Sequence, residues 1–333
     1  MEKEFDGNIP AICVYGASIP EAHEKSLLAL REKGLWYARS GPKDKGRQQV
    51  DSTMMMQINY PNSGPLIHKF LVACPVDSLL EFGYEILGAK DELVVDPQTD
   101  PANDTRWTYT YFGRFKKYNK ELGRTIDQVA AVIRKIGTEP NRRSSQMITW
   151  QPETDLTEKD PACMQRAWFF AVPMPDGSFN LNGNYSFRSR NPMIAAPMNL
   201  FGQNILQNYI AQQATIRSGR KITSGRIVDI SDSYHVSADN QEYFRSFLEQ
   251  VDNSVKRGET IEQRAFSRDW VVGQMQDMIE TGEIKDKIAG QLKDRFTERK
   301  QAHPGLSKSL DERADIALAE LSTIHEQLRG ILV

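Results

Sequence analysis

The sequence predicts an α+β fold, and three features of the 333-residue chain lead to that prediction. Apolar residues recur at helical spacing in the N-terminal third, and strand-type alternation dominates the middle. Beyond residue 240 the chain is mostly charged amphipathic helix, including 269–281 and 310–328. A chain of this length can bury a substantial core. We therefore expect a single domain over 1–333, with 240–333 as a mostly helical C-terminal extension.

The first 60 residues predict two strands and a helix. A strand is expected at 11–15, followed by a helix that begins at Pro20 and ends near residue 33. Residues 39–47 form a basic loop that contains glycine. Met54, Met56 and Ile58 fall on one face of 52–60, which is typical of a strand with one apolar face.

The next segment predicts two more helices around an acidic loop. Asp77 is the expected N-cap of a helix that Gly88 ends. The loop covers 91–104. The helix at 126–136 is amphipathic, because its apolar residues recur three and four positions apart.

The middle of the chain is rich in strands. These are expected at 146–150, 166–172 and 179–188, with a Pro-Asp-Gly turn before the last of them. A helix at 199–214 and a strand at 226–230 follow. This run of strands before the helical tail supports the α+β prediction.

Composition excludes several classes of function. The formal net charge of −2 gives no general basic field for nucleic acid, so no nucleic-acid partner is expected. The three cysteines, Cys13, Cys74 and Cys163, lack metal-ligand spacing, and the five histidines are dispersed, so no metal site is expected. The charged N-terminus and the lack of a long apolar run predict a cytoplasmic chain without membrane contact.

Cys163 is the leading candidate for a nucleophile. It lies where a polar loop meets the apolar stretch 167–172, so we expect it at a surface. Arginines at 142, 143 and 188 are expected around it, and a positive field stabilises thiolate over thiol. The same guanidinium groups suit a phosphate monoester. The alternative is that Cys163 is a small buried apolar residue, the usual state of a free cysteine.

Five short motifs follow one another around this cysteine. They are Arg142-Arg143, Thr149-Trp150-Gln151-Pro152, Pro161-Ala162-Cys163, Phe187-Arg188-Ser189 and Pro197-Met198-Asn199. In order and spacing these motifs resemble thymidylate synthase and the related pyrimidine-nucleotide hydroxymethylases, over about residues 79–240. One gap is longer than in that family, and the extra residues fall in the hairpin turn at 173–177, where insertion costs little. The resemblance implies a large mixed sheet flanked by helices.

The resemblance assigns roles in covalent chemistry on a pyrimidine nucleoside monophosphate. Cys163 would attack C6 of the ring and make C5 a carbon nucleophile. Arg188 would stabilise the thiolate and bind the phosphate, to which Ser189 adds a hydrogen bond. Arg142 and Arg143 would reach the phosphate of the neighbouring subunit, which implies a homodimer with arginines shared across the interface. The alternative for Arg188 is a surface arginine at a strand end. The alternative for Arg142 and Arg143 is a solvated basic turn.

Two further positions carry competing candidates. Arg39 resembles a phosphate-binding arginine of a mobile loop in the family, with Lys43 or Arg47 as alternatives. Glu81, seven residues before a glycine, resembles the catalytic glutamate. On an apolar helix it would be partly desolvated and could relay protons through ordered water. An exposed helical glutamate is the alternative for Glu81, and Glu85 is its competitor.

The base is expected to meet a phenol and a carboxamide. Tyr109 and Tyr111 stand near the position where the family has a tyrosine that assists proton removal from C5. Tyr111 is the candidate for this tyrosine. The alternative is that Tyr111 is only an aromatic residue of the core. Asn199 can donate to O4 and accept from N3–H, which favours uracil over cytosine. A helix N-cap is the other interpretation of Asn199.

Departures from the family affect the sugar and the folate. His235 resembles the histidine that holds the sugar 3′-hydroxyl, and Ser237 stands where its tyrosine partner is expected. The smaller serine leaves space beside the sugar, so discrimination against ribose is open. Asn191 and Ala195 replace an aspartate and a glycine near the pterin. Together with Glu81 they are the residues expected to contact 5,10-methylenetetrahydrofolate, with altered geometry.

These features favour a one-carbon transferase with 5,10-methylenetetrahydrofolate as co-substrate. A dUMP 5-hydroxymethylase is preferred because several positions depart from thymidylate synthases. Thymidylate synthase itself and a dCMP or CMP hydroxymethylase remain alternatives. Outside enzymes, a nucleotide- or RNA-binding module is the other class, but binding alone needs no thiolate.

Overall fold

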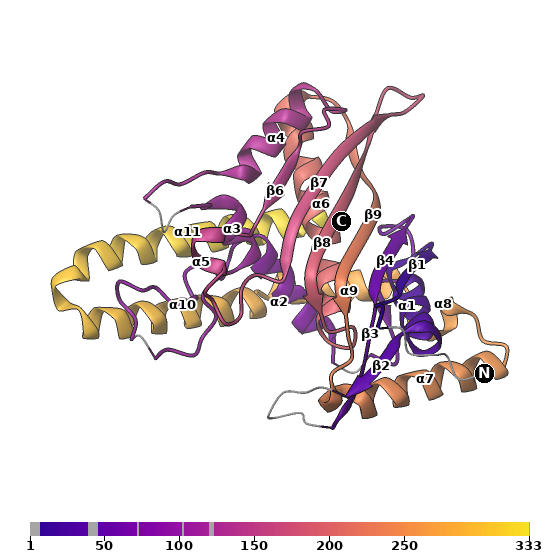
Figure 1. Ribbon diagram of the computed structural model, residues 1–333. Coiled ribbons are helices and arrows are strands. Elements are labelled where there is room, and N and C mark those ends of the chain that lie inside the picture. Colours follow the sequence, from indigo (N-terminus) through magenta and orange to yellow (C-terminus); the bar gives the residue numbers. More distant parts are fainter. Residues whose placement is uncertain (1–6, 39–45, 72, 102, 120–122, 333) are drawn as a thin grey trace.

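The computed structural model describes residues 7–38, 46–71, 73–101, 103–119 and 123–332, and it has the predicted α+β architecture (Figure 1). A six-stranded sheet forms its centre. The strands are β1 (Ala11–Gly16), β4 (Thr53–Ile58), β6 (Gln146–Ile148), β7 (Met164–Pro173), β8 (Phe179–Arg190) and β9 (Ile222–Tyr234). Their order is β1-β4-β9-β8-β7-β6. The sheet is mixed, because β1–β4 and β8–β9 are parallel pairs and the other neighbours are antiparallel.

Helices surround this sheet, and two short strand pairs lie outside it. The pairs are β2 (Leu35–Ala38) with β3 (Gln48–Asp51) and β5 (Ile67–His68) with β10 (Ala265–Phe266). The helices are α1 (Ile19–Lys33), α2 (Val76–Ile86), α3 (Tyr111–Lys116), α4 (Gln128–Thr138), α5 (Pro152–Asp155), α6 (Ala195–Ser218), α7 (Gln241–Lys256), α8 (Ile261–Arg264), α9 (Arg268–Thr281), α10 (Glu283–Ala302) and α11 (Ser307–Ile331).

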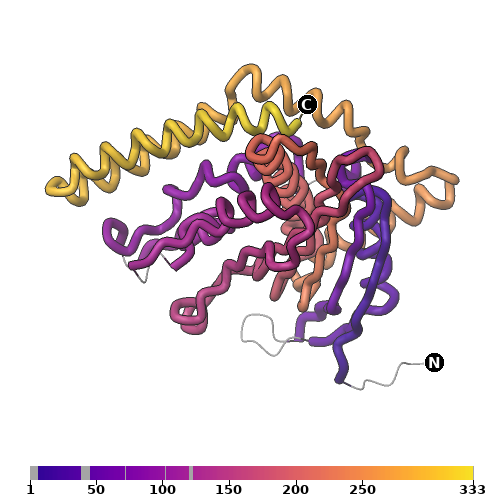
Figure 2. The backbone as a smooth tube through the Cα atoms, turned by 90° about the horizontal axis from the view of Figure 1, so that it is seen from above, coloured from indigo at the N-terminus to yellow at the C-terminus, as the bar shows by residue number. Residues whose placement is uncertain are grey.

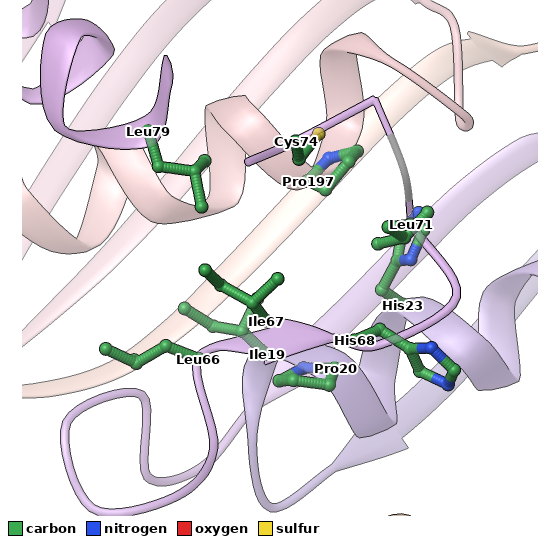
Figure 3. A pocket seen from close by; sticks show the side chains of 10 residues that line it. All are labelled: Ile19, Pro20, His23, Leu66, Ile67, His68, Leu71, Cys74, Leu79 and Pro197. Carbon is green, nitrogen blue, oxygen red and sulfur yellow. The ribbon is translucent and has the colours of Figure 1, made fainter. Parts of the chain in front are cut away.

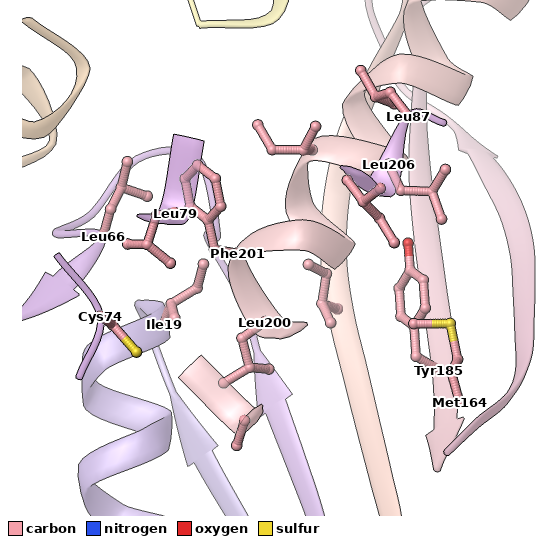
Figure 4. Packing of buried hydrophobic residues seen from close by; sticks show 14 of the residues in the cluster. Ile19, Leu66, Cys74, Leu79, Leu87, Met164, Tyr185, Leu200, Phe201 and Leu206 are labelled. Carbon is pink, nitrogen blue, oxygen red and sulfur yellow. The ribbon is translucent and has the colours of Figure 1, made fainter. Parts of the chain in front are cut away.

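The core lies between α6 and one face of the sheet. Alternate residues of β8, among them Leu181, Tyr185 and Phe187, are fully buried, as a period of two places them on one face. α6 contributes Leu200 and Phe201, which lie near residues of α1 and α2 (Figure 4). α6 is therefore buried on several sides, and this explains why its apolar residues show little one-sided periodicity.

Three details of the helices differ from expectation. α2 begins one residue before Asp77, so Asp77 lies in its first turn and Pro75 is the N-cap. α4 begins at Gln128, because the carboxylate of Asp127 caps the helix. Ile126 therefore precedes α4, and it is 48 % exposed. α6 begins at Ala195, so Asn199 lies inside the helix and the N-cap interpretation of this residue is wrong.

The C-terminal extension explains the acidic loop at 91–104. α10 and α11 form a long antiparallel hairpin that projects beside the rest of the molecule (Figures 1 and 2). Arg295 and Arg299 of α10 are buried and form ion pairs with Asp100 of the loop. Arg313 of α11 pairs with Glu92 at 2.6 Å and with Asp96 at 2.9 Å. The loop and the hairpin thus neutralise each other's charges.

Candidate active site

Cys163 lies immediately before β7, at the strand entry that the sequence predicts. Its side chain is half-buried against the core, and its carbonyl accepts from the backbone N–H of Arg188 at 2.9 Å. The antiparallel pairing of β7 with β8 therefore places Arg188 beside the cysteine. Cys163 is neither fully buried nor fully exposed, as a nucleophile in a pocket wall would be.

The guanidinium of Arg188 binds the backbone that leads into Cys163. Nη2 donates to the carbonyl of Pro161 at 2.6 Å, and Nε donates to that of Ala162 at 3.3 Å. Two donors in a fixed fork hold this short segment in one position. Arg188 thus orients the cysteine-bearing loop in addition to placing a positive charge near it.

The prediction that nearby arginines lower the pKa of the Cys163 thiol is wrong for the isolated chain. Burial raises the pKa of Cys163, and the opposing effect of Arg188 does not reverse the direction. Asp160 raises the pKa further, and Arg190 lowers it. The sequence argument counted the arginines but not the desolvation of the thiol. A larger thiolate fraction therefore requires charge from outside this set of residues.

Two tyrosines accompany Cys163. The hydroxyl of Tyr109 reaches the carbonyl of Pro161 at 3.5 Å, and the rings of Tyr109 and Tyr111 lie 6.0 Å apart. Burial, together with the charge of an ionised Cys163, raises the pKa of Tyr109 to about 12 and also raises the pKa of Tyr111 well above its ordinary value. Both phenols stay protonated at neutral pH, so either can donate a hydrogen bond. The structure brings Tyr111 to the site, and its catalytic role stays a prediction.

A capping interaction fixes the tyrosines. Thr110, the N-cap of α3, accepts from the backbone N–H of Gly113 at 2.9 Å and donates to the carboxylate of Asp91. Burial raises the pKa of Asp91 to about 6. Because Thr110 stands between the two tyrosines, the buried Asp91 holds the segment that presents both rings.

Asn199 offers an unused carboxamide. It lies in the second turn of α6 with only 6 % of its surface exposed. Among the residues that the structure describes, its side chain forms no hydrogen bond, although buried polar groups are normally paired. The amide therefore has donor and acceptor capacity left for a ligand.

Asn191 and Ala195 lie on either side of the turn that leads into α6. The carboxamide oxygen of Asn191 accepts from the backbone N–H of Met193 at 2.8 Å. That oxygen keeps a second lone pair, so a pterin N–H can still be accepted. Ala195 is the first residue of α6 and is partly buried.

A polar hollow of about 230 Å³ lies at the ends of β8 and β9. Ser189 and His235 both line it, as expected for neighbours in a nucleotide site. Ser237 does not line it: its hydroxyl accepts from Asn240 at 2.9 Å. Ser233 takes its place, with its Oγ 3.1 Å from Nδ1 of His235. The full lining is Tyr37, Gln49, Asp51, Ser189, Ser233 and His235.

Glu81 is held by two lysines. Its oxygens accept from Lys90 and from Lys287 of α10, each at 2.7 Å. Burial alone would raise the pKa of Glu81, but these ion pairs outweigh it and lower the pKa. The alternative of an exposed helical glutamate is wrong, and the expected partial desolvation of Glu81 is confirmed. Glu85, which lies 3.5 Å from Lys90, has a pKa that burial raises. Of the two, Glu85 has the pKa direction of a proton donor.

Arg142 and Arg143 are exposed and remote from Cys163 of the same chain. Arg142 contacts Glu139 and Ser144, and the carbonyl of Arg143 accepts from the indole of Trp168. Trp168 is five residues along β7 from Cys163, which corresponds to roughly 16 Å. These arginines therefore do not complete the site of their own chain. Their action across an interface stays a prediction.

The basic loop contributes one described basic residue, Arg47. Arg39 and Lys43 lie outside the described residues. Arg47 forms an ion pair with Asp239 at 2.8 Å.

The sequence did not single out Asp51, Ser233 or Arg190. Asp51 lies on β3, more than 180 residues from Ser233, so only pairing of the strands brings the two side chains together. The presence of Ser233 two residues before His235 was a usable signal. Arg190 forms a buried pair with Asp229 and gave no signal beyond its place after Arg188.

A second, mostly apolar hollow lies between α1 and residues 66–79 (Figure 3). His23 lines it and donates from Nε2 to the carbonyl of Pro192 at 2.7 Å. Burial lowers the pKa of His23 to about 4 and raises that of the Cys74 thiol to about 12. Both side chains are neutral near pH 7, so this hollow has the character of core.

The mixed sheet and the Cys163–Arg188 pair define a class of α+β protein with a cysteine at the entry of a central strand. The family model described as "Thymidylate synthase" matches residues 99–276, which is more than half of the chain. The chain therefore belongs to the thymidylate synthase family. The match ends before α10, so the hairpin of α10 and α11 lies outside it.

Individual relatives are more distant. The chain is 29% identical over 134 residues to a "Putative thymidylate synthase" of Methanosarcina barkeri, covering 40% of this chain and 55% of the relative. It is 30% identical over 128 residues to one of Methanosarcina mazei, covering 38% and 52%. A "Thymidylate synthase" of Coxiella burnetii is 28% identical over 116 residues, or 34% and 42%. The chain thus spans about half the length of the curated relatives it matches.

The described residues show neither a membrane-spanning helix nor a cluster of metal-ligating side chains. None of their helices is long and apolar enough to cross a membrane. Their His, Cys, Asp and Glu side chains form no group of three or more that could hold a metal ion.

Proposed function

We propose that this chain transfers a one-carbon unit from 5,10-methylenetetrahydrofolate to C5 of a uracil nucleoside monophosphate. The observation that carries the proposal is the grouping of Cys163, Arg188, Tyr109 and Tyr111 at one end of β7 and β8. A nucleophile, a cation and two neutral phenols are the groups that covalent activation of a pyrimidine ring uses. Family membership supports the same chemistry.

Each residue of the site has its own role in the proposed reaction. Sγ of Cys163 bonds to C6, and the electron pair of the C5–C6 double bond moves toward C5 and O4. Arg188 holds the thiolate-bearing loop, and Asn199 binds the O4 and N3–H edge of uracil. A phenol, Tyr109 or Tyr111, positions the water that takes the C5 proton. Release of the C6–S bond then regenerates Cys163.

The raised thiol pKa also has a place in this proposal. A nucleotide phosphate would be held by Arg188 and by arginines of a second copy. Those arginines bring additional positive charge toward Cys163, which lowers the pKa of a thiol. The isolated chain therefore keeps its cysteine protonated, and assembly of the complete site activates it.

The folate is placed through Asn191. When bound, 5,10-methylenetetrahydrofolate supplies the one-carbon unit and, in reductive methylation, the hydride. The free lone pair of the Asn191 oxygen can accept from the pterin ring. Ala195 begins α6 two residues after Met193, so it borders the same turn.

Reductive methylation, the thymidylate synthase reaction, is the form that we favour. The relatives are named thymidylate synthase or putative thymidylate synthase. The preference for hydroxymethylation depends on positions that depart from the family, yet two phenols lie beside Cys163. Hydroxymethylation remains the second candidate because Asn191 stands where the family has an aspartate. Mass spectrometry of the product distinguishes a methyl group from a hydroxymethyl group.

The site is proposed to be completed by a second copy of the chain. Arg142 and Arg143 are solvent-exposed and far from their own Cys163. On β1 and β7, Tyr15 is 55 % exposed and Val172 is 40 % exposed. Exposed apolar side chains on the central sheet suit a self-association surface.

The test is release of tritium from 5-[³H]-uracil nucleotides in the presence of the folate. The wild-type chain is expected to release tritium, and Cys163→Ser is expected to abolish release while it retains nucleotide binding. Cys13→Ser is the matched control, because Cys13 is exposed on β1 and distant in the sheet order from β7. Release by Cys163→Ser at the wild-type rate would remove Cys163 from the mechanism. Nucleotide binding without any release by the wild type would favour a binding module.

A further inference from the structure

The C-terminal extension reaches a residue that is predicted to act in catalysis. Lys287 of α10 donates to Oε2 of Glu81, and Lys90 donates to Oε1, each at 2.7 Å. The Glu81 side chain is 17 % exposed, whereas the Lys287 side chain is 52 % exposed. The two lysines therefore bind different oxygens of a largely buried carboxylate, and together they fix its charge and its orientation.

Packing of α10 presents Lys287 to α2. Ile284 and Ile288 of α10 are buried, and α10 packs against α2. Residues three apart on a helix are neighbours on its surface, so Lys287 lies beside Ile284 at the margin of the buried face. Further along α10, Arg299 donates to the carbonyl of Glu92 at 3.1 Å. The helix is thus anchored both before and after Lys287, and its position relative to Glu81 is fixed.

Glu85 shows the behaviour of a carboxylate on α2 that lacks Lys287. Glu81 and Glu85 both contact Lys90, Glu81 at 2.7 Å and Glu85 at 3.5 Å. Burial raises the pKa of Glu85 despite this lysine. Burial acts on Glu81 in the same direction, but its hydrogen bonds with Lys287 and Lys90 outweigh burial and lower its pKa. Among the described residues Lys287 pairs with Glu81 and not with Glu85, so it contributes to these opposite directions.

Other charged groups around α2 do not replace Lys287. Glu81, followed by Asp77 and Glu283, raises the pKa of Lys287, so its ammonium group stays charged. The charged groups on α3, α6, α9 and α11, which also pack against α2, either are exposed or have partners other than Glu81. They include Arg114, Lys116, Arg217, Arg268, Asp269, Asp277, Glu280, His325, Glu326 and Arg329.

We propose that Lys287 is a positioning residue of the reaction, which holds Glu81 ionised and aligned, so that the C-terminal extension is part of the catalytic machinery. This inference rests on the proposed function, in which water takes the C5 proton, and on the predicted role of Glu81 as a relay for protons through ordered water. An ionised carboxylate has about four acceptor positions, so Glu81 keeps about two for such water after it binds both lysines.

The experiment measures the rate of tritium release from 5-tritiated dUMP with the folate, from about pH 5 to 9. Lys287→Met removes the ammonium group and keeps an apolar stem. At pH 7 its kcat is expected to fall roughly fivefold, which corresponds to about 1 kcal/mol for a pair with an exposed partner. Its KM for dUMP should stay within about twofold of the wild type, because Lys287 acts through Glu81. Loss of the cation raises the pKa of Glu81, so the acidic limb of the kcat profile should move to higher pH.

Two further variants separate this role from a structural one. Lys287→Arg keeps the charge and can still donate to Oε2 of Glu81, so it should restore most of the rate and the acidic limb of the wild type. Lys293→Met is the matched control, because Lys293 is exposed on the same helix, and it should leave kcat and the pH profile unchanged. Both methionine variants should unfold at the same urea concentration as the wild type, since each replaces an exposed side chain by a good helix former.

Carbon NMR of the glutamate carboxyl groups reports on Glu81 without any need for activity. The Glu81 signal is assigned by its absence in Glu81→Gln. In Lys287→Met this signal should titrate at a higher pH than in the wild type, and in Lys287→Arg it should titrate close to the wild-type pH.

Three results overturn the inference. One is a kcat profile that Lys287→Met leaves unchanged, and another is a loss of rate that Lys287→Arg does not recover. A Glu81 signal that titrates at the same pH with and without Lys287 is the third. Tritium release by the wild type alongside any of these leaves the proposed function standing and removes the role of Lys287. Absence of tritium release by the wild type removes both.

Discussion

The buried ion pair of Arg190 and Asp229 should be a large and measurable contributor to stability. The two side chains are 1% and 0% exposed, and Nη1 of Arg190 donates to Asp229 at 2.7 Å. Gln203 of α6 donates to the same carboxylate, and the guanidinium lies 4.3 Å from the ring centroid of Phe187. The carboxylate thus neutralises a cation that has no access to water.

Asp229→Asn keeps the shape of the side chain and removes its charge. Arg190 stays protonated, because its guanidinium does not lose a proton in proteins, and it is left as an uncompensated buried charge. Breaking a buried pair in this way costs about 3–5 kcal/mol. We expect the free energy of unfolding to fall by about that amount. Arg190→Met combined with Asp229→Leu should recover most of the loss, because no unpaired charge remains.

Urea denaturation followed by tryptophan fluorescence measures these differences. Glu326→Gln is the control, since Glu326 pairs with Arg329 at 3.7 Å on the surface, where both side chains are more than half exposed. Its effect should stay within about 0.5 kcal/mol. A cost below about 1 kcal/mol for Asp229→Asn would refute the reasoning. So would a double variant as unstable as the single one, because the loss would then not come from an unpaired charge.

Three further predictions concern pH, base and assembly. Burial raises the pKa of Asp91 to about 6, so the folded state binds this proton more tightly than the unfolded chain. The resulting stability is fully present below about pH 4 and is lost as the pH rises through 6. Asp91→Asn should remove this decline and gain up to about 3 kcal/mol at pH 7, as urea unfolding from pH 4 to 8 would show; parallel pH curves would contradict it. Asn199→Asp should shift the preference in kcat/KM from uridylate toward cytidylate, by a free-energy difference of about 1–3 kcal/mol. A wild type that prefers cytidylate would show that Asn199 does not select the base. Mixing Cys163→Ser with an Arg142→Ala/Arg143→Ala variant should restore activity at roughly a quarter of the sites, because half of the dimers would be mixed and each would hold one intact site. No recovery after verified subunit exchange would exclude action across the interface.

Local patterns predicted the elements of the central sheet well. The strand with Met54, Met56 and Ile58 on one face occurs as β4, and all three side chains are fully buried. Helix boundaries were less accurate. α6 begins four residues before Asn199, since its start depends on the turn at 191–194 and not on helical periodicity. The ends of helices depend on capping contacts, which a periodic pattern does not encode.

The electrostatics of the site could not be read from neighbours in the sequence. Arginines near Cys163 suggested a lowered thiol pKa, but burial against the core raises it. Glu81 was expected as a partly desolvated acid, and Lys287 of the C-terminal extension instead holds it ionised. Both effects come from groups that tertiary packing adds or from water that it removes.

The sequence by itself determined the α+β class, the position of Cys163 at a strand entry and the pairing of that position with Arg188. Each depends on residue order along one strand or on two strands joined by a short turn, so nearby residues suffice. Only the tertiary structure decided that Ser233 replaces Ser237 beside His235, that Asp51 lines the same hollow and that α10 reaches Glu81. These contacts join segments that are distant in the chain, and they form because parallel and antiparallel pairing of remote strands, together with helix packing, buries them in one place.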